Sequence, residues 1–200
     1  WISGVFGSGK SHFVKILSYL LKDDFEVDGM KPIKYFEDKI DDQVLLADIE
    51  KAQKVPTDVI LFNVDSKSDS DSKNDKEAII KVFNKVFNEH MGYCGSIPWL
   101  ADLERKLDKD GNYDDFKKEF QNITGDIWED KRADFYFIEE PIINSLVETT
   151  QISEEAARHW FRSSEENYSI SIEEFAKRVQ NYIEKQGNNH HVLFLVDEIG

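Results

Sequence analysis

A glycine-rich octapeptide near the start of the chain constrains the fold more than any other feature. Residues 4–11 read GVFGSGKS and match the phosphate-binding pattern G-x-x-x-x-G-K-[ST] at every defined position. Such a loop leaves a buried strand and enters a helix, and its backbone N–H groups converge on the phosphates of a nucleotide. The alternative is a glycine-rich turn that fits the pattern by chance. The apolar residues before it and the helical pattern after it favour the phosphate-binding loop.

Each defined residue of this loop has a physical role. Gly4, Gly7 and Gly9 allow backbone angles and a close approach that a Cβ atom would prevent. Lys10 would bring its positive charge to the β and γ phosphates, and the hydroxyl of Ser11 would reach a Mg²⁺ ion.

Two adjacent carboxylates near the end of the chain complete the predicted site. Asp197 and Glu198 follow the apolar run VLFLV, which is typical of a buried parallel strand. An acid in this position orders Mg²⁺ in phosphate-loop enzymes, so Asp197 is the predicted second magnesium ligand. Glu198 is the predicted general base that activates water for attack on the γ-phosphate. The pair therefore favours ATP hydrolysis, with ATP and Mg²⁺ as cofactors, over phosphate transfer to a small molecule.

The remaining pattern predicts an α/β fold, a P-loop NTPase with a three-layer αβα parallel sheet and a large, mostly helical insertion. Apolar runs and turn residues place strands at residues 1–3, 25–27, 55–64 and 192–198. Apolar residues at three- and four-residue steps place helices at residues 10–22, 40–49, 75–91 and 171–187.

The distance between the two halves of the site is large. Lys10 and Asp197 are 197 − 10 = 187 residues apart, whereas a βα unit needs only about 30 residues. We therefore predict one incomplete domain over residues 1–200, with its core in 1–91 and 169–200 and the helical insertion at about 92–168. The loop after the second strand places Asp65 or Ser66 near the nucleotide or a partner; the alternative is a solvated Ser/Asp loop.

Composition limits the partners. The 200 residues include 40 acidic and 25 basic side chains, a net charge of −15, which disfavours nucleic acid and anionic membranes. The single cysteine, Cys94, excludes an internal disulfide and fits a reducing compartment. With no apolar run of about 20 residues, we expect a cytoplasmic protein that does not enter a membrane. We also expect an excerpt of a longer protein, because the chain starts part-way into a predicted strand.

Three stretches together resemble the large P-loop ATPase of bacterial BREX phage-exclusion systems. They are WISGVFGSGKSHF at residues 1–13, VILFNVDSKS at 59–68 and LFLVDEIG at 193–200. The resemblance implies an AAA+-like ATPase of an antiviral defence complex whose partners are the other defence proteins. It leaves open DNA contact and a homo-oligomer in which a neighbouring subunit supplies an arginine, so that the excerpt alone would be inactive. The candidate nucleotide-binding residues are Gly4, Gly7, Ser8, Gly9, Lys10, Ser11 and His12.

Two other functions remain open at this point. The chain could be a nucleotide-gated scaffold that binds ATP, barely hydrolyses it and acts through its helical insertion. It could also be a DNA-associated motor, which would need a basic surface that the acidic composition does not indicate.

Overall fold

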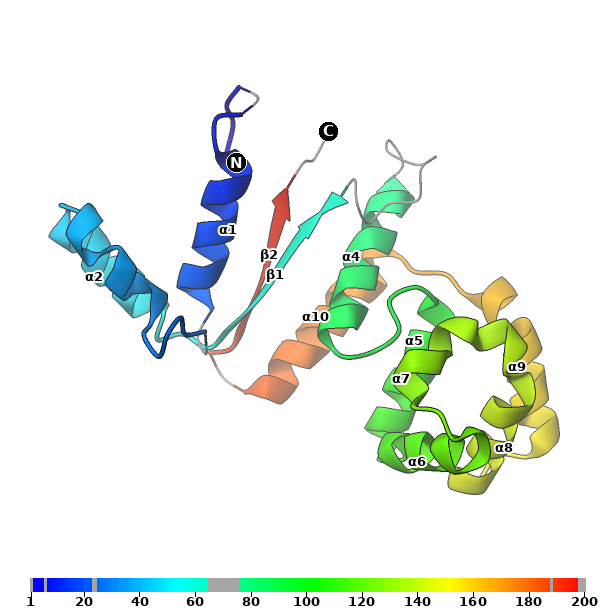
Figure 1. Cartoon of the computed structure of the whole chain (residues 1–200). Coiled ribbons are helices and arrows are strands. Elements are labelled where there is room, and N and C mark those ends of the chain that lie inside the picture. The colour runs from blue at the N-terminus through cyan, green and yellow to red at the C-terminus, as the bar shows by residue number, and fades with distance from the viewer. Residues whose placement is uncertain (1, 6, 23–24, 65–75, 188, 198–200) are drawn as a thin grey trace. The chain divides into compact units, whose positions relative to one another are not determined.

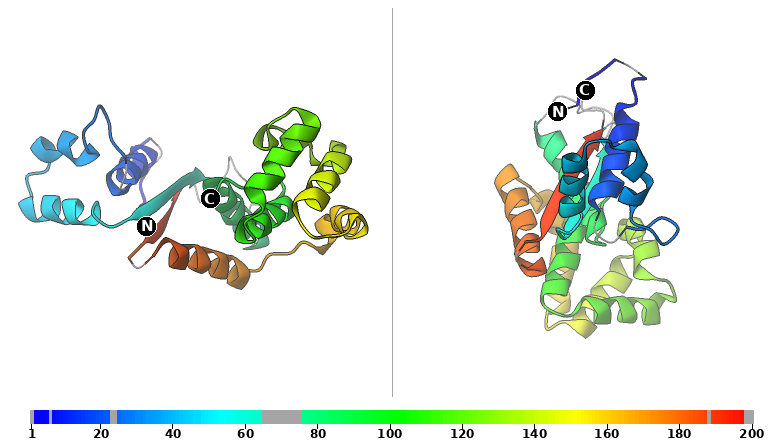
Figure 2. Two further views of the ribbon diagram at one scale, coloured as in Figure 1. Left: turned by 90° about the horizontal axis from the view of Figure 1, so that it is seen from below. Right: turned by 90° about the vertical axis from the view of Figure 1, so that its left-hand side faces the viewer.

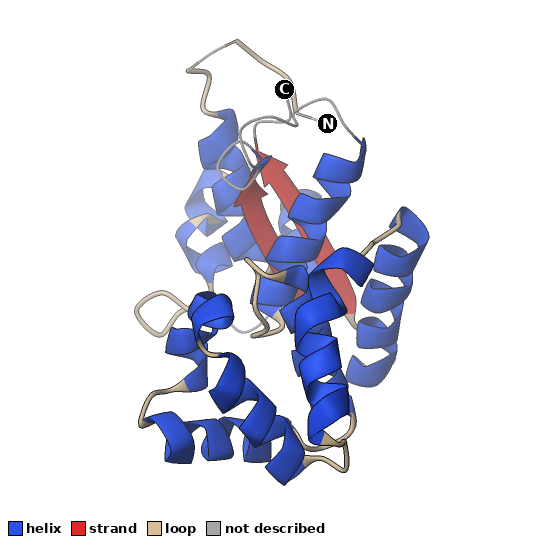
Figure 3. Cartoon of the chain, turned by 90° about the vertical axis from the view of Figure 1, so that its right-hand side faces the viewer, coloured by secondary structure: helices blue, strands red, loops and turns tan. Residues whose placement is uncertain are grey.

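The computed structural model describes residues 2–5, 7–22, 25–64, 76–187 and 189–197. The chain divides into two compact units, Trp1–Val82 with Ser171–Gly200, and Phe83–Ile170. We call the first the strand unit and the second the helical unit, and each is described by itself. Helices predominate among the described residues (Figure 3). Whether the helical unit is an insertion into an ATPase domain stays a prediction.

The strand unit holds the described strands. Its elements are α1 (Lys10–Leu21), the 3₁₀-helices η1 (Pro32–Tyr35) and η2 (Glu37–Lys39), α2 (Gln43–Ala52), β1 (Thr57–Asn63), the first part of α4 (Lys76–His90), α10 (Ile172–Gln186) and β2 (His191–Asp197). The helices predicted at 10–22, 40–49, 75–91 and 171–187 are therefore confirmed, with their ends shifted by up to three residues. The strands predicted at 55–64 and 192–198 are confirmed as β1 and β2.

β1 and β2 form one parallel two-stranded sheet (Figure 1). The register runs from Thr57 opposite His191 to Asn63 opposite Asp197. Helix α1 contacts both strands and α10 contacts β2; α1 lies beside the strands in both views of Figure 2. On β1 the alternate residues Ile60 and Phe62 are buried, as the two-residue period of a strand requires.

Local sequence signals explain where the helices begin. Asp42 caps α2, because its carboxylate accepts hydrogen bonds from the backbone N–H groups of Val44 and Leu45. Ser171 and Glu174 form the capping box of α10, each side chain accepting from the other residue's backbone N–H at 3.1 and 2.9 Å. Gly187 follows the last turn of α10 with φ +108°, a conformation that glycine adopts without steric cost.

The predicted three-layer αβα sheet is wrong. In the part of the chain that the structure describes, β1 and β2 pair only with each other, and residues 2–5 are not in a strand. Val27 forms only an isolated bridge with Met30, because Asp28 and Gly29 both have positive φ and turn the chain back on itself. The predicted edge strand at 25–27 is thus replaced by a local turn.

The helical unit has a core of its own. Its elements are the remainder of α4, α5 (Pro98–Lys109), α6 (Tyr113–Thr124), α7 (Trp128–Lys131), η3 (Arg132–Phe137), α8 (Glu139–Thr149) and α9 (Glu154–Asn167). Aromatic and aliphatic side chains fill this core, among them Phe116, Phe120, Trp128, Ile142 and Ile143, each at most 1% exposed. The rings of Phe116 and Phe120 meet the Trp128 ring edge-on, with centroids 4.9 and 5.0 Å apart.

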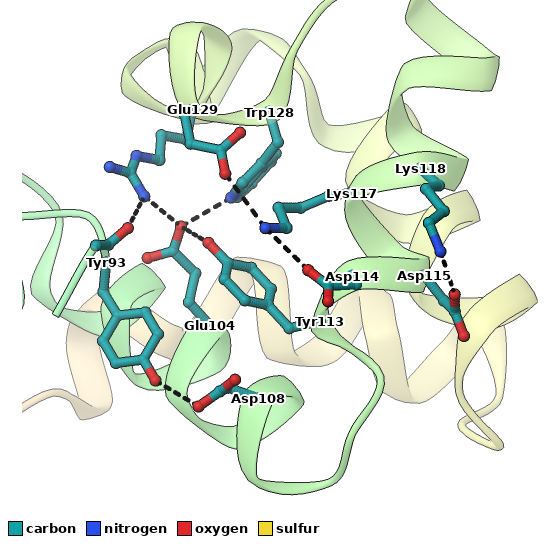
Figure 4. A network of polar contacts seen from close by, with 12 residues as sticks. Tyr93, Glu104, Asp108, Tyr113, Asp114, Asp115, Lys117, Lys118, Trp128 and Glu129 are labelled. Carbon is teal, nitrogen blue, oxygen red and sulfur yellow. Dashed lines mark hydrogen bonds and ion pairs between the residues drawn. The ribbon is translucent and has the colours of Figure 1, made fainter. Parts of the chain in front are cut away.

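A buried carboxylate lies at the centre of the helical unit (Figure 4). Glu104 is 0% exposed and accepts hydrogen bonds from Trp128 Nε1 at 2.7 Å and Tyr113 Oη at 2.9 Å. It also accepts from the backbone N–H of Cys94 at 2.5 Å and from the Arg132 guanidinium at 3.0 Å. The carboxylate is therefore both paired and fully hydrogen-bonded, which is the condition under which a charge can be buried.

A polar contact also joins the two ends of the helical unit. The Asn84 amide, near its start, donates to Tyr168 Oη, near its end, at 3.1 Å. Asn84 is 1% exposed, so this hydrogen bond forms away from water. The chain thus enters and leaves the helical unit at neighbouring points.

Substituting Glu104 should destabilise the protein strongly. Glu104→Ala leaves the Arg132 charge, the Trp128 N–H and the Tyr113 hydroxyl without their shared acceptor, and we expect a loss of about 3–5 kcal/mol in the free energy of unfolding. Urea unfolding measures the loss. The control is Asp115→Ala, because the Asp115 side chain is 68% exposed in its pair with Lys118 and such pairs contribute about 0–1 kcal/mol. Equal losses in the two variants would contradict a central role for Glu104.

The helical unit should also lose stability at alkaline pH. Burial and the Glu104 carboxylate raise the pKa of Tyr113, and burial and the hydrogen bond to Asp108 raise the pKa of Tyr93. Above the ordinary tyrosine pKa of about 10 the unfolded chain releases these protons and the folded chain keeps them, so stability falls as pH rises. Each tyrosine should contribute about 1.4 kcal/mol per pH unit to that fall. Urea unfolding between pH 9 and 11 should show a shallower fall for Tyr113→Phe; an unchanged slope would contradict the assignment.

Candidate functional site

The glycine-rich loop of the strand unit turns in the way its sequence predicts. Gly7 and Gly9 have φ +76° and +85°, which places both in the left-handed region that other residues enter only at a cost. The backbone N–H of Ser8 donates to the Val5 carbonyl at 3.2 Å, and that of Phe13 donates to the Gly9 carbonyl at 2.9 Å. The loop therefore passes directly into α1, with Gly9 as the residue before the helix.

Gly4 lies close to the side chain of Ser8 across the loop. A Cβ atom at this position would lie 2.8 Å from Ser8 Oγ, inside van der Waals contact. The first and fifth residues of the pattern thus contact each other across the loop. A side chain at position 4 would therefore require the Ser8 hydroxyl to move.

Lys10 folds back over the loop. Its ammonium donates to the carbonyls of Gly4 at 2.9 Å and Val5 at 3.0 Å. These bonds keep the positive charge against the loop, where it remains exposed to solvent. The same three donors of an ammonium can exchange a carbonyl for a phosphate oxygen.

The start of α1 is open to an anion. Gly9 offers no side-chain cap, and the first turn of α1 holds no acidic residue, so no side chain of that turn competes for its unpaired N–H groups. Ser11 and His12 are exposed there. The helix dipole adds a partial positive charge at this end. The donor set therefore fits a phosphate group.

Asp197 lies at the same edge of the strand unit. It is the last residue of β2, it is half-buried, and its register partner is Asn63. Figure 1 shows the N-terminal end of α1 at the edge where both strands end, which is the edge at which parallel sheets bind ligands. Mg²⁺ retains several waters and needs only one or two protein carboxylates, so Asp197 and the Ser11 hydroxyl have the ligand chemistry that a magnesium site would use.

Three sequence-predicted residues lie outside the described part of the chain. They are Glu198, Asp65 and Ser66. The assignment of Glu198 as general base and of the Asp65 loop to the nucleotide therefore stays a prediction.

The sequence reasoning missed two features of this site. Asn63 stands beside Asp197 at the end of the sheet, and the signal was available, because each residue is the next to last of a predicted strand. The contacts of Lys10 with the Gly4 and Val5 carbonyls had no signal, because they depend on how the loop closes on its own lysine.

Comparisons with known proteins do not add a family. No family model matches the chain, and no solved structure is significantly similar to it. The resemblance to a BREX ATPase therefore stays a prediction from the motifs.

Two searches of the described residues were negative. No group of three or more His, Cys, Asp or Glu side chains within them could hold a metal ion. Among the same residues, no helix is both long enough and apolar enough to cross a bilayer.

Cys94 is buried and its sulfur lies 3.5 Å from Ser96 Oγ.

Gly9 should be required for anion binding beyond its effect on stability. Alanine at φ +85° costs about 1–2 kcal/mol, so Gly9→Ala should relax the loop and weaken ATP binding about tenfold, measured by calorimetry. The control is Gly125→Ala, because Gly125 has φ +79° after α6 in the helical unit. Gly125→Ala should lower the melting temperature by about as much as Gly9→Ala does, and it should leave the ATP affinity unchanged. Equal affinities of the two variants would contradict the role of the loop.

Proposed function

We propose that this chain binds ATP with Mg²⁺ through residues 4–11 and hydrolyses it to ADP and phosphate. The observation that supports binding most directly is the loop itself: two glycines with positive φ, an uncapped helix start and a lysine folded over the turn. These groups are all donors or positive charge, and a polyphosphate is their chemical complement. Asp197 at the adjacent strand end supports a magnesium ion beside the phosphates.

Each residue has a defined part in the proposed reaction. Lys10 would exchange the loop carbonyls for phosphate oxygens, and Ser11 and Asp197 would hold Mg²⁺ directly or through its waters. When bound, Mg²⁺ neutralises charge on the β and γ phosphates. Glu198, adjacent in sequence to Asp197, accepts the proton of the attacking water.

Removing the lysine tests binding. Lys10→Ala should weaken ATP binding about 10- to 100-fold, since a hydrogen bond to a charged group contributes about 1.5–3 kcal/mol. Calorimetric titration with ATP and Mg²⁺ measures the change. Lys15→Ala is the matched control, because Lys15 is an exposed lysine further along α1. ATP binding by Lys10→Ala at the wild-type affinity would rule the proposal out.

A second variant tests hydrolysis. Glu198→Gln should bind ATP as the wild type does and lose phosphate release. Release is measured over a range of protein concentrations, because the family resemblance implies that a neighbouring subunit supplies an arginine.

A nucleotide-gated scaffold is the second candidate. It is favoured by the helical unit, which has a core of its own and so can act as a binding module. In this case ATP would bind at the loop and Glu198→Gln would change nothing, because turnover would already be negligible in the wild type.

The wider setting is proposed from the sequence alone. Resemblance supports a role in a bacterial BREX antiviral complex with other defence proteins as partners. The single cysteine supports a cytoplasmic location. The net charge of −15 does not support DNA binding by this chain itself. We therefore assign any DNA contact to the full-length protein.

A further inference from the structure

Three polar side chains meet at the edge of the strand unit where the strands begin. Asp58, the second residue of β1, accepts at Oδ2 a hydrogen bond from Tyr182 Oη at 2.5 Å. The same oxygen lies 2.8 Å from His190 Nε2. The ring of His190 also meets the Tyr182 ring edge-on, with centroids 5.9 Å apart.

These residues come from three different elements. Asp58 belongs to β1, Tyr182 to α10, and His190 to the turn that leads from α10 into β2. Next to them, the backbone N–H of His191 donates to the Pro56 carbonyl at 2.8 Å. Burial and the hydrogen bond to Asp58 raise the pKa of Tyr182, so its hydroxyl stays protonated as a donor.

The apolar residues of the two strands do not fix their register. β1 contributes VILF and β2 contributes VLFLV, so nearly every pairing places aliphatic or aromatic side chains opposite one another. A slip of one residue exchanges the two faces of a strand, but a slip of two residues keeps them. The polar contacts at the start of the strands distinguish the observed register from a two-residue slip, because such a slip would separate Asp58 from His190.

A two-residue slip would matter most at the opposite edge. Each residue of a parallel strand rises about 3.3 Å, so Asp197 would move by about 6.6 Å. A Mg²⁺ ligand must lie about 2.0–2.1 Å from the ion, or one water further away. An Asp197 displaced by that amount could not serve the ion that Ser11 contacts.

We propose that Asp58, Tyr182 and His190 form a register clamp that positions Asp197 for the magnesium ion at the glycine-rich loop. The clamp rests on the proposed function, since it acts on the ion of that site. Its three residues are positioning residues, because they lie at the start of the strands and Asp197 lies at the end.

The test measures how much Mg²⁺ tightens ATP binding. The ratio of dissociation constants without and with Mg²⁺ is compared in the wild type and in Tyr182→Phe, which removes one hydroxyl and keeps the ring. We expect the ratio to fall about three- to tenfold, the range of one hydrogen bond, while Mg²⁺-free ATP binding stays within about twofold. Tyr35→Phe is the control: the Tyr35 hydroxyl donates to the Val27 carbonyl in the same unit, and its loss should leave the ratio unchanged.

A double-mutant cycle separates positioning from general destabilisation. In an Asp197→Ala background the Mg²⁺ effect is already lost, so adding Tyr182→Phe should cause no further change in the ratio. Asp58→Asn keeps an acceptor oxygen, so its ratio of dissociation constants should lie closer to the wild-type ratio than that of Asp58→Ala.

The possible outcomes distinguish failure of the clamp from failure of the proposed function. The clamp would be wrong if Tyr182→Phe changed the ratio equally in the wild-type and Asp197→Ala backgrounds. It would also be wrong if Tyr182→Phe weakened ATP binding without Mg²⁺. Neither result would contradict ATP binding at the loop. A wild-type chain that binds ATP with no benefit from Mg²⁺ would overturn the clamp too. A wild-type chain that binds no ATP at all would instead overturn the proposed function, and the clamp with it.

Discussion

The pairing of β1 with β2 is the interaction on which the strand unit depends. It joins segments separated by 191 − 63 = 128 residues, and closing a loop of that length in an otherwise unfolded chain costs on the order of 4 kcal/mol. The seven register pairs and the contacts of α1 and α10 with the strands must offset this cost. Without the pairing, Asp197 would have no fixed relation to the start of α1, and the candidate site would be two unrelated segments.

The sequence predicted the elements of the molecule better than their assembly. Periodicity located α1, α4 and α10, because the spacing of apolar residues along a helix is a local property of the sequence. The sheet was overpredicted, because the phosphate-loop pattern implies more strands than pair in the described part of the chain. The turn at Asp28 and Gly29 shows why: two consecutive positive φ angles close the backbone locally, and the apolar residues beside them could not reveal that.

The candidate site also has features that the sequence predicts and features that depend on the folded chain. The positive φ of Gly7 and Gly9 and the placement of Asp197 at a strand end follow from local rules. The Lys10 contacts and the Asp58 cluster depend on the folded backbone. Glu104 is the clearest case of what one sequence cannot reveal, since its partners Tyr113, Trp128 and Arg132 lie up to 28 residues away along the chain. In the sequence it is one of 40 acidic residues, and only burial distinguishes it.

The hydrogen bond between Asn84 and Tyr168 has an evolutionary consequence. Because it brings the two ends of the helical unit together, the chain between β1 and β2 behaves as a much shorter connection than its residue count implies. Duplication, trimming or replacement of helices between these two residues would leave the entropy of strand pairing almost unchanged. The helical unit is thus the segment in which lineages could diverge in length and surface without disturbing the loop and the strand ends.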